Sequence, residues 1–214
     1  MAKRTSTIER CERTIYTIRP RPYLSWSALS TLESSEKGYK KIYMQGFKLH
    51  NAGMALGSKV AEAMESDEET GDLMEDFVIS QIPKFEKREM ELRTEIEVGG
   101  VKIPLLGKMD SAREDLTGIK EVKTGVTSWG QKKVDNFGQL TFYCTMIYSM
   151  TGRIPEDIEL IYAPSERYEG MMRLTGEVRR FKTKRTLADV MKMKIRMKNA
   201  WILIGKLSAE ELGI

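Results

Sequence analysis

The stretch Glu91–Thr124, ELRTEIEVGGVKIPLLGKMDSAREDLTGIKEVKT, predicts the architecture of the chain. Its first eight residues alternate between two faces, with Leu92 and Ile96 on the apolar one, as in a half-buried strand. Gly99-Gly100 favours a two-residue hairpin because glycine readily takes a positive φ. We expect strands at Glu91–Val98, Val101–Arg113 and Ile119–Thr124.

Helical patterns lie on both sides of this β segment. Helices are expected at Ser25–Tyr43, Asn51–Met64, around Gly71–Gln81, at Gln131–Met150 and at Thr186–Leu203, with further strands at Asp157–Tyr162 and Gly170–Lys182. No repeat or low-complexity linker interrupts the pattern, so residues 1–214 are predicted to form a single domain. The order predicts an α/β fold: a mixed β-sheet flanked by helices, with a C-terminal strand and helix as an extension.

The composition excludes several classes of protein. Of the 214 residues, 41% are hydrophobic and 31% are charged, which is typical of a globular chain. No apolar run approaches the roughly 20 residues of a membrane helix, and the N-terminus lacks the apolar core of a secretory signal. We therefore expect a cytoplasmic protein without a membrane partner. Two cysteines and one histidine exclude a disulfide scaffold and a His-His-carboxylate metal site.

Positive charge gathers toward both ends of the chain. Residues 1–22 hold six Lys or Arg against two acids, and residues 165–206 hold twelve against four. Basic ends suit a polyanion such as nucleic acid. The net charge is only +4, and ordinary solvated faces explain the same pattern.

Three charged residues carry the chemistry of the predicted sheet. Glu121 and Lys123 are two apart on one strand and therefore share a face, and the neighbouring strand can bring Asp110 beside them. Paired carboxylates bind hard cations such as Mg²⁺, and the backbone carbonyl of Val122 could add an oxygen ligand. Surface charge pairing is the simpler alternative, but charges on otherwise apolar strands are costly unless they are paired or metal-bound.

Asp110 and Glu121-Val-Lys123 together resemble the signature of the PD-(D/E)XK nuclease superfamily. Gln139-Leu-Thr-Phe-Tyr143 resembles the Q-x-x-x-Y motif of its RecB-like branch, which includes phage exonucleases. Further upstream, Leu24–Leu29 (LSWSAL) resembles the opening S-x-S-x-L motif of that branch, and Gly57–Glu62 (GSKVAE) resembles its G-x-x-x-H-E helix. The resemblance implies a restriction-endonuclease-like core.

The resemblance also implies an activity and its residues. Asp110, Glu121 and Val122 would hold Mg²⁺ or Mn²⁺, and Lys123 would position the attacking water. Gln139 and Tyr143 would contact DNA phosphate or the metal shell, although their apolar neighbours also suit a core helix. The expected function is a metal-dependent DNA nuclease, an exonuclease of phage or bacterial recombination and repair. A phage-encoded protein would act in the host cytoplasm. DNA is the expected partner, and a single-strand annealing or recombination protein is a candidate protein partner. Whether the chain forms an oligomer is left open.

Two positions depart from the family pattern. Ala61 stands where the family has a histidine, and Glu62 is a candidate substitute ligand that could equally be a solvent-facing glutamate. Ser34-Ser35 occupies a position where relatives often have a cluster-binding cysteine. With only two cysteines in the chain, no iron–sulfur cluster is expected.

Two other functions remain open at this point. The chain could be a catalytically impaired nuclease fold that binds DNA or protein, or a Mg²⁺ phosphoesterase acting on small substrates. Trp129 follows the strand of Lys123 in a glycine-flanked turn. It could pack inside the fold or reach DNA.

Overall fold

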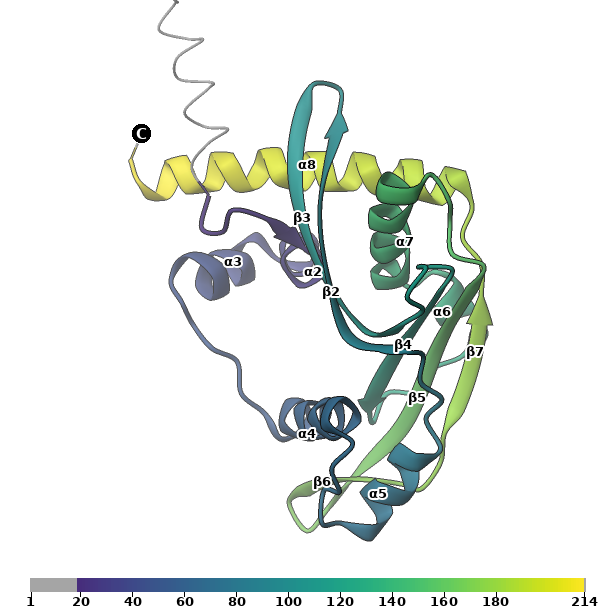
Figure 1. The fold of residues 1–214 in the computed structure, drawn as a ribbon. Coiled ribbons are helices and arrows are strands. Elements are labelled where there is room, and N and C mark those ends of the chain that lie inside the picture. The colour runs from purple at the N-terminus through teal and green to yellow at the C-terminus, as the bar shows by residue number, and fades with distance from the viewer. Residues whose placement is uncertain (1–18, 214) are drawn as a thin grey trace, which may run out of the picture. The chain divides into compact units, whose positions relative to one another are not determined.

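A computed structural model describes residues 19–213; Cys11 and the basic residues before Arg19 lie outside this part. The elements in chain order are β1 (Leu24–Ser25), α2 (Trp26–Ser34), α3 (Glu36–Tyr39), the π-helix η1 (Lys40–Met44), α4 (Ala52–Ser66), α5 (Leu73–Ser80), β2 (Lys87–Val98), β3 (Val101–Ala112), β4 (Gly118–Gly125), α6 (Gln131–Asp135), α7 (Gly138–Thr151), β5 (Asp157–Tyr168), β6 (Met171–Leu174), β7 (Arg179–Thr183) and α8 (Leu187–Glu211) (Figure 1). No helix among residues 19–213 is long and apolar enough to span a membrane.

The strands form one mixed sheet of seven members. The strand order is β1-β3-β4-β5-β6, with β2 also paired to β3 and β7 to β5. β1 runs parallel to β3 and β4 runs parallel to β5, whereas β3–β4, β5–β6 and β5–β7 are antiparallel. The predicted α/β class, with a mixed sheet flanked by helices and a C-terminal strand and helix, is confirmed.

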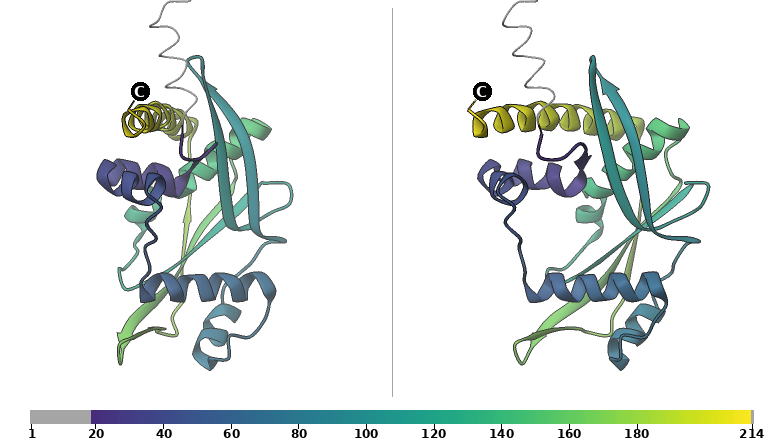
Figure 2. Two further views of the ribbon diagram at one scale, coloured as in Figure 1. Left: turned by 90° about the vertical axis from the view of Figure 1, so that its left-hand side faces the viewer. Right: turned by 60° about the vertical axis from the view of Figure 1, so that its left-hand side comes forward.

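The β2–β3 hairpin turns where the sequence predicts it. Gly99 and Gly100 have φ angles of 56° and 75°, which strongly favour glycine. Figure 2 shows the two strands as a long twisted ribbon that ends at this turn. The alternating pattern also holds, because Leu92 and Ile96 are buried while Glu91, Glu95 and Glu97 are exposed.

The predicted single helix at Ser25–Tyr43 is wrong. Ser35 breaks it, with an extended backbone at φ −168° and ψ 115°. The N–H of Ser35 donates to the Thr31 carbonyl and closes α2, while its Oγ accepts from the Gly38 N–H and opens α3. One serine thus ends one helix and caps the next, a role that serine fills well because its side chain mimics a backbone acceptor.

The predicted helix at Gln131–Met150 is also two helices. Phe137 is extended, at φ −74° and ψ 109°, between α6 and α7. The guanidinium of Arg185 donates to the carbonyls of Val134 (3.0 Å) and Phe137 (3.2 Å) at this break. Arg185, about fifty positions later in the sequence, therefore satisfies carbonyls that a continuous helix would have satisfied itself. Local periodicity does not predict this contact.

The described chain divides into two compact units. Unit 1 takes its described residues from 19–49, 93–106 and 191–213, and unit 2 comprises 50–92 and 107–190. Both units draw on separate stretches of the sequence, and the single domain over residues 1–214 stays a prediction.

Unit 1 is held by contacts between segments distant in the sequence. Arg196 of α8 forms a two-pronged ion pair with Glu33 of α2, with Nε–Oε1 and Nη2–Oε2 distances of 2.9 and 2.6 Å. The guanidinium of Arg19 lies over the Trp201 ring, 4.0 Å from its centroid. These contacts join the N-terminal helices to the last helix.

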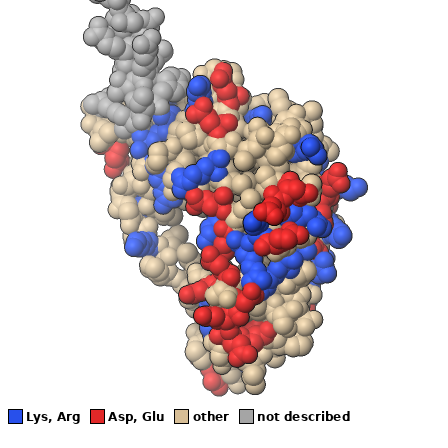
Figure 3. Space-filling model, in the orientation of Figure 1, with Lys and Arg blue, Asp and Glu red and all other residues tan. Residues whose placement is uncertain are grey.

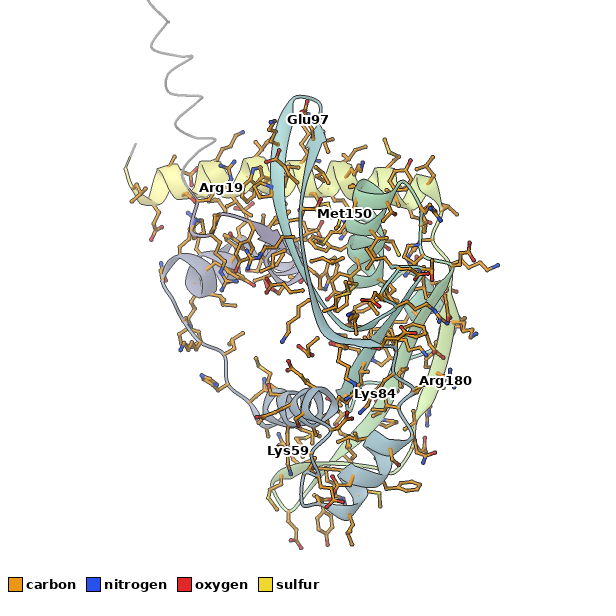
Figure 4. The ribbon with its side chains drawn as sticks, in the orientation of Figure 1. Arg19, Lys59, Lys84, Glu97, Met150 and Arg180 are labelled. Atoms are coloured by element: carbon orange, nitrogen blue, oxygen red, sulfur yellow. The ribbon has the colours of Figure 1, made fainter. Side chains whose placement is uncertain are left out.

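Unit 2 contains a core of apolar side chains beneath helix α4. The cluster comprises Leu56, Val60, Ala63, Met64, Val78, Ile79, Ile82, Ile161, Ala163 and Leu174. On the helices themselves, Lys59 of α4, labelled in Figure 4, forms an ion pair with Glu75 of α5 at 2.6 Å. The core fixes α4 against β5 and β6, so that the helix presents a defined face to the neighbouring strand β4.

Candidate active site

A cavity of about 360 Å³ lies in unit 2 between α4 and the strands β2, β3 and β4. Its lining residues are Met54, Gly57, Ser58, Val60, Ala61, Met64, Glu65, Glu89, Asp110, Val122, Lys123 and Thr124. The lining includes both Asp110 and Lys123, so the structure brings together strand residues that the sequence places twelve or more positions apart.

Asp110 is held where strands β3 and β4 separate. In the antiparallel ladder between β3 and β4, Ser111 pairs with Lys120 and Ala112 with Ile119. One position further on, the Asp110 carboxylate replaces the ladder bond: its Oδ2 accepts the backbone N–H of Val122 at 2.7 Å. Continuing the register sets Asp110 opposite Glu121, so the two side chains share a face of the sheet, as the sequence predicts.

Glu121 is buried beside Asp110 and is only partly satisfied. Its side chain is 2% exposed, and Oε1 accepts from Lys123 Nζ at 2.5 Å. Its other oxygen, Oε2, is buried without a hydrogen-bond partner. An ionised oxygen in that state is costly, which marks this carboxylate as a group that lacks a cation or donor.

Burial and neighbouring charges shift the pKa values of Asp110, Glu121 and Lys123. Burial, together with the neighbouring Asp110 charge, raises the pKa of Glu121 to about 8. Burial also raises the pKa of Asp110, against the opposing effects of Lys123 and the Val122 N–H. Desolvation alone would lower the pKa of Lys123, but Glu121 and Asp110 outweigh it and the pKa rises. The lysine is therefore a cation at neutral pH.

Glu89 is a third carboxylate that the sequence analysis does not identify. It lines the cavity from β2 and forms an ion pair with Lys108. Its φ of 46° is uncommon for a residue with a side chain and occurs inside a strand. Strained backbone often accompanies function. From the sequence, Glu89 looks like one more solvent-facing glutamate of an acidic strand.

The half-buried Gln139 and the buried Tyr143 form a hydrogen-bonded chain to the backbone of β3. The Tyr143 hydroxyl donates to the Lys108 carbonyl at 2.5 Å, and Gln139 Nε2 donates to that hydroxyl at 2.8 Å. Tyr143 is 4% exposed, and burial raises its pKa. The pair thus supports the backbone two residues before Asp110, and contact with DNA phosphate or the metal shell stays a prediction.

Gly107 lets helix α7 approach β3 at this point. A Cβ at residue 107 would lie 2.8 Å from Met146 Sδ and 3.2 Å from the Tyr143 ring. A Cβ here would require the Met146 side chain to shift and would crowd the Tyr143 ring. Gly107 therefore allows the tyrosine to reach the Lys108 carbonyl.

Helix α4 contributes a different carboxylate from the predicted one. Ala61 lines the cavity, at the position where the resemblance expects a histidine. Glu62 is exposed and is not among the lining residues, whereas Glu65, one turn from Ala61, is. Glu62 as a metal ligand stays a prediction, and Glu65 has the better placement.

Arg185 is a second residue that sequence reasoning misses. It is 7% exposed, and besides the two carbonyls at the α6–α7 break it donates to the hydroxyls of Thr141 (2.8 Å) and Thr183 (2.7 Å). It fixes the start of α7, which carries Gln139. Its position in a basic stretch makes it look like one of many surface cations.

The oxygen atoms of the site suit a hard divalent cation. Within residues 19–213, no three Asp, Glu, Cys or His side chains gather closely enough to hold a metal alone. Mg²⁺ commonly takes one or two carboxylates and completes its shell with water and substrate phosphate. Asp110 and Glu121 fit that pattern, because Glu121 Oε2 is a buried oxygen in need of a partner.

Comparisons with known proteins leave the family open. No family model and no curated protein matches the chain. Among solved structures, SSO0001 is similar over 91% of this chain and 87% of its own, at 14% identity and a TM-score of 0.49. Rai1 from Candida albicans, in complex with pU5 and Mn²⁺, is similar over 55% of this chain, at 16% identity and a TM-score of 0.24.

Rai1 from Scheffersomyces stipitis, in complex with (3'-NADP)⁺ and a calcium ion, is similar over 57% of this chain, at 17% identity and a TM-score of 0.22. The chain spans only 34% and 31% of the two Rai1 chains. Likenesses at these TM-scores establish neither a family nor a function.

Proposed function

We propose that the chain is a divalent-metal-dependent nuclease that hydrolyses phosphodiester bonds. The observation that supports this most directly is the half-satisfied Glu121 carboxylate, which is buried against Asp110 and Lys123, two residues that line the cavity. Glu75 also has a buried oxygen without a hydrogen-bond partner, but that oxygen lies 2.6 Å from Lys59 Nζ, whereas no ion pair reaches Glu121 Oε2 among residues 19–213. Strongly shifted groups that converge in a cavity are typical of functional sites.

The residues divide the work as follows. Asp110 and Glu121 would hold the cation, with the Val122 carbonyl as a further oxygen and Glu89 close by. Lys123 is a cation at neutral pH, so its ammonium group can donate a hydrogen bond to the oxygen of an attacking water and thereby orient it. The same positive charge can offset negative charge on the phosphate. Mg²⁺ or Mn²⁺ at this site would lower the pKa of a water and neutralise phosphate charge.

The finer assignment follows from the sequence resemblance. We propose DNA as the substrate, attack from a chain end as the mode and phage or bacterial recombination and repair as the setting, with a single-strand annealing or recombination protein as a candidate partner. The resemblance of Asp110, Glu121-x-Lys123 and Gln139-x-x-x-Tyr143 to RecB-like nucleases supports these proposals.

Digestion of end-labelled linear DNA tests the proposal. With Mg²⁺ or Mn²⁺, the wild type should shorten the DNA, and Asp110→Asn and Lys123→Ala should not. Lys182→Ala is the matched control, because this lysine is 75% exposed on β7 and does not line the cavity. Equal cutting by wild type and Lys123→Ala would refute the assignment.

A non-catalytic nuclease fold is the second candidate. Ala61 favours it, because this methyl group lines the cavity where related enzymes are expected to offer a metal-binding histidine. Such a module would bind DNA or protein without cutting. An absence of cleavage at any Mn²⁺ concentration, together with undiminished DNA binding by Lys123→Ala, would favour the module over the nuclease.

A further inference from the structure

A second cavity adjoins the first at Thr124, and the proposed function does not use it. Its volume is about 690 Å³, within the range of roughly 300–1,000 Å³ that is usual for small-molecule sites. Its lining residues are Asn51, Ala52, Gly53, Thr124, Gly125, Val126, Thr127, Trp129, Lys133, Arg167 and Met172. All of them belong to unit 2, and Thr124 is common to both cavities.

The two cavities have opposite charge. The first is lined by three carboxylates, those of Glu65, Glu89 and Asp110, and by one cation, Lys123. No Asp or Glu is among the described residues that line the second, which has the cations Lys133 and Arg167. A cavity with cations and no carboxylate suits an anion, and it lies next to one that suits a cation.

An aromatic ring stands at the wall of the second cavity. Trp129 contacts Phe137 edge to face, with ring centroids 4.8 Å apart and planes at 80°. Lys133 Nζ lies 4.1 Å from the Trp129 ring centroid. The ammonium group lies over one face of the indole, so a nucleotide base would stack on the opposite face, with Lys133 as a cation for its phosphate.

Arg167 differs from the other arginine of its hairpin. Arg173, on the paired strand β6, donates to Glu166 at 2.6 and 2.8 Å and lies over the Tyr168 ring. Arg167 lines the cavity, and its guanidinium has no hydrogen bond or ion pair to any residue of 19–213. Its guanidinium can therefore donate two parallel hydrogen bonds to a phosphate, the bidentate geometry that arginine favours.

We propose that the second cavity binds one unpaired nucleotide next to the phosphate that reacts in the first. This inference rests on the proposed nuclease function. A base that stacks on a protein aromatic ring must leave its own base pair or stack. The chain therefore prefers single-stranded DNA or a frayed end to an intact duplex, with Trp129 as the stacking residue and Arg167 and Lys133 as phosphate contacts.

Binding in Ca²⁺ buffer tests this inference without cleavage. The probes are a short fluorescein-labelled single strand and a closed hairpin duplex of the same composition, followed by anisotropy. We expect the single strand to bind more tightly. Trp129→Ala should weaken it about tenfold, the loss of one base stack, and Trp129→Phe should retain most of the affinity.

A substitution of Arg167, on the exposed β5–β6 hairpin, tests the phosphate contact independently of the stacking residue. Arg167→Gln should weaken single-strand binding several-fold and lower the salt slope by about one. Arg173→Gln is the matched control and should bind as wild type. Equal affinity for strand and hairpin, or equal losses for Arg167→Gln and Arg173→Gln, would overturn the inference.

The two proposals fail in different ways. A chain that cuts DNA through Lys123 but binds equally well after Trp129→Ala remains a nuclease without this nucleotide site. A chain that binds the single strand through Trp129 and never cuts it has the nucleotide site and is not a nuclease.

Discussion

Strand β4 carries buried charge on both of its faces, and the two faces are treated differently. On one, Lys120 lies 3.6 Å from the buried Glu159, which also accepts from Arg180 at 2.7 and 3.0 Å. Arg180 is labelled in Figure 4, and Figure 3 shows Lys, Arg, Asp and Glu side chains interspersed over β5 and β7. On the other face, Glu121 has one satisfied oxygen and one without a partner.

The difference separates structural charge from functional charge. Both Glu159 oxygens are bonded, so that network stabilises the sheet and needs nothing further. Glu121 keeps one oxygen without a hydrogen-bond partner and has a pKa raised to about 8, a state that folding alone does not favour. Departures from the rule that buried polar groups are hydrogen-bonded occur most often at functional sites.

The largest expected effect is on cleavage. Asp110→Asn and Glu121→Gln keep the shape of the side chain and remove its charge, so each should lower kcat about a thousandfold or more, because the neutral group would no longer hold the cation where it activates the attacking water. The measurement is steady-state digestion at saturating Mn²⁺ with circular dichroism as a check of folding. Cleavage within a factor of a few of wild type would contradict the role of that carboxylate.

On the other face, Glu159→Gln should cost stability and spare catalysis. The substitution leaves the buried Lys120 without its carboxylate, at a cost of about 3–5 kcal/mol in the free energy of unfolding. The change is measured by urea unfolding. Loss of kcat at a temperature where the variant is fully folded would remove the distinction between the two faces.

Gly107→Ala should disturb the support of Asp110. The new Cβ meets Met146 and the Tyr143 ring, so we expect a loss of about 1–3 kcal/mol in stability from overpacking. The Tyr143–Lys108 hydrogen bond should weaken with it. Thermal unfolding measures the loss, and Gly130→Ala is the control, because a Cβ there meets nothing within 4 Å.

The smallest effect is a pH slope in the metal-free protein. Glu121 has a pKa of about 8 when folded against an ordinary value of 4.5, so the folded chain binds more protons between these values. The free energy of unfolding should therefore fall as pH rises through this window. In EDTA, we expect the Tm of the wild type to fall by a few degrees more than the Tm of Glu121→Gln as the pH is raised through this window, because the glutamine cannot titrate. A Tm that rises with pH only in the wild type would contradict the burial of this carboxylate.

Local pattern predicts much of this fold and part of its site. The β2–β3 hairpin, β4 and α4 follow from alternation, Gly99-Gly100 and helical spacing, and the strand geometry correctly places Asp110 beside Glu121. Arg185 cannot be predicted in this way, because its bonds to Val134 and Phe137 exist only in the folded chain. Glu89 needs a positive φ that no neighbouring residue signals.

Calorimetric titration with Mn²⁺ tests the central claim most directly, in wild type, Glu121→Gln and Glu159→Gln. The account predicts that wild type and Glu159→Gln bind Mn²⁺ alike, and that Glu121→Gln binds at least tenfold more weakly. Equal binding by Glu121→Gln and wild type, or no binding by the folded wild type, would contradict a metal site on this face of β4.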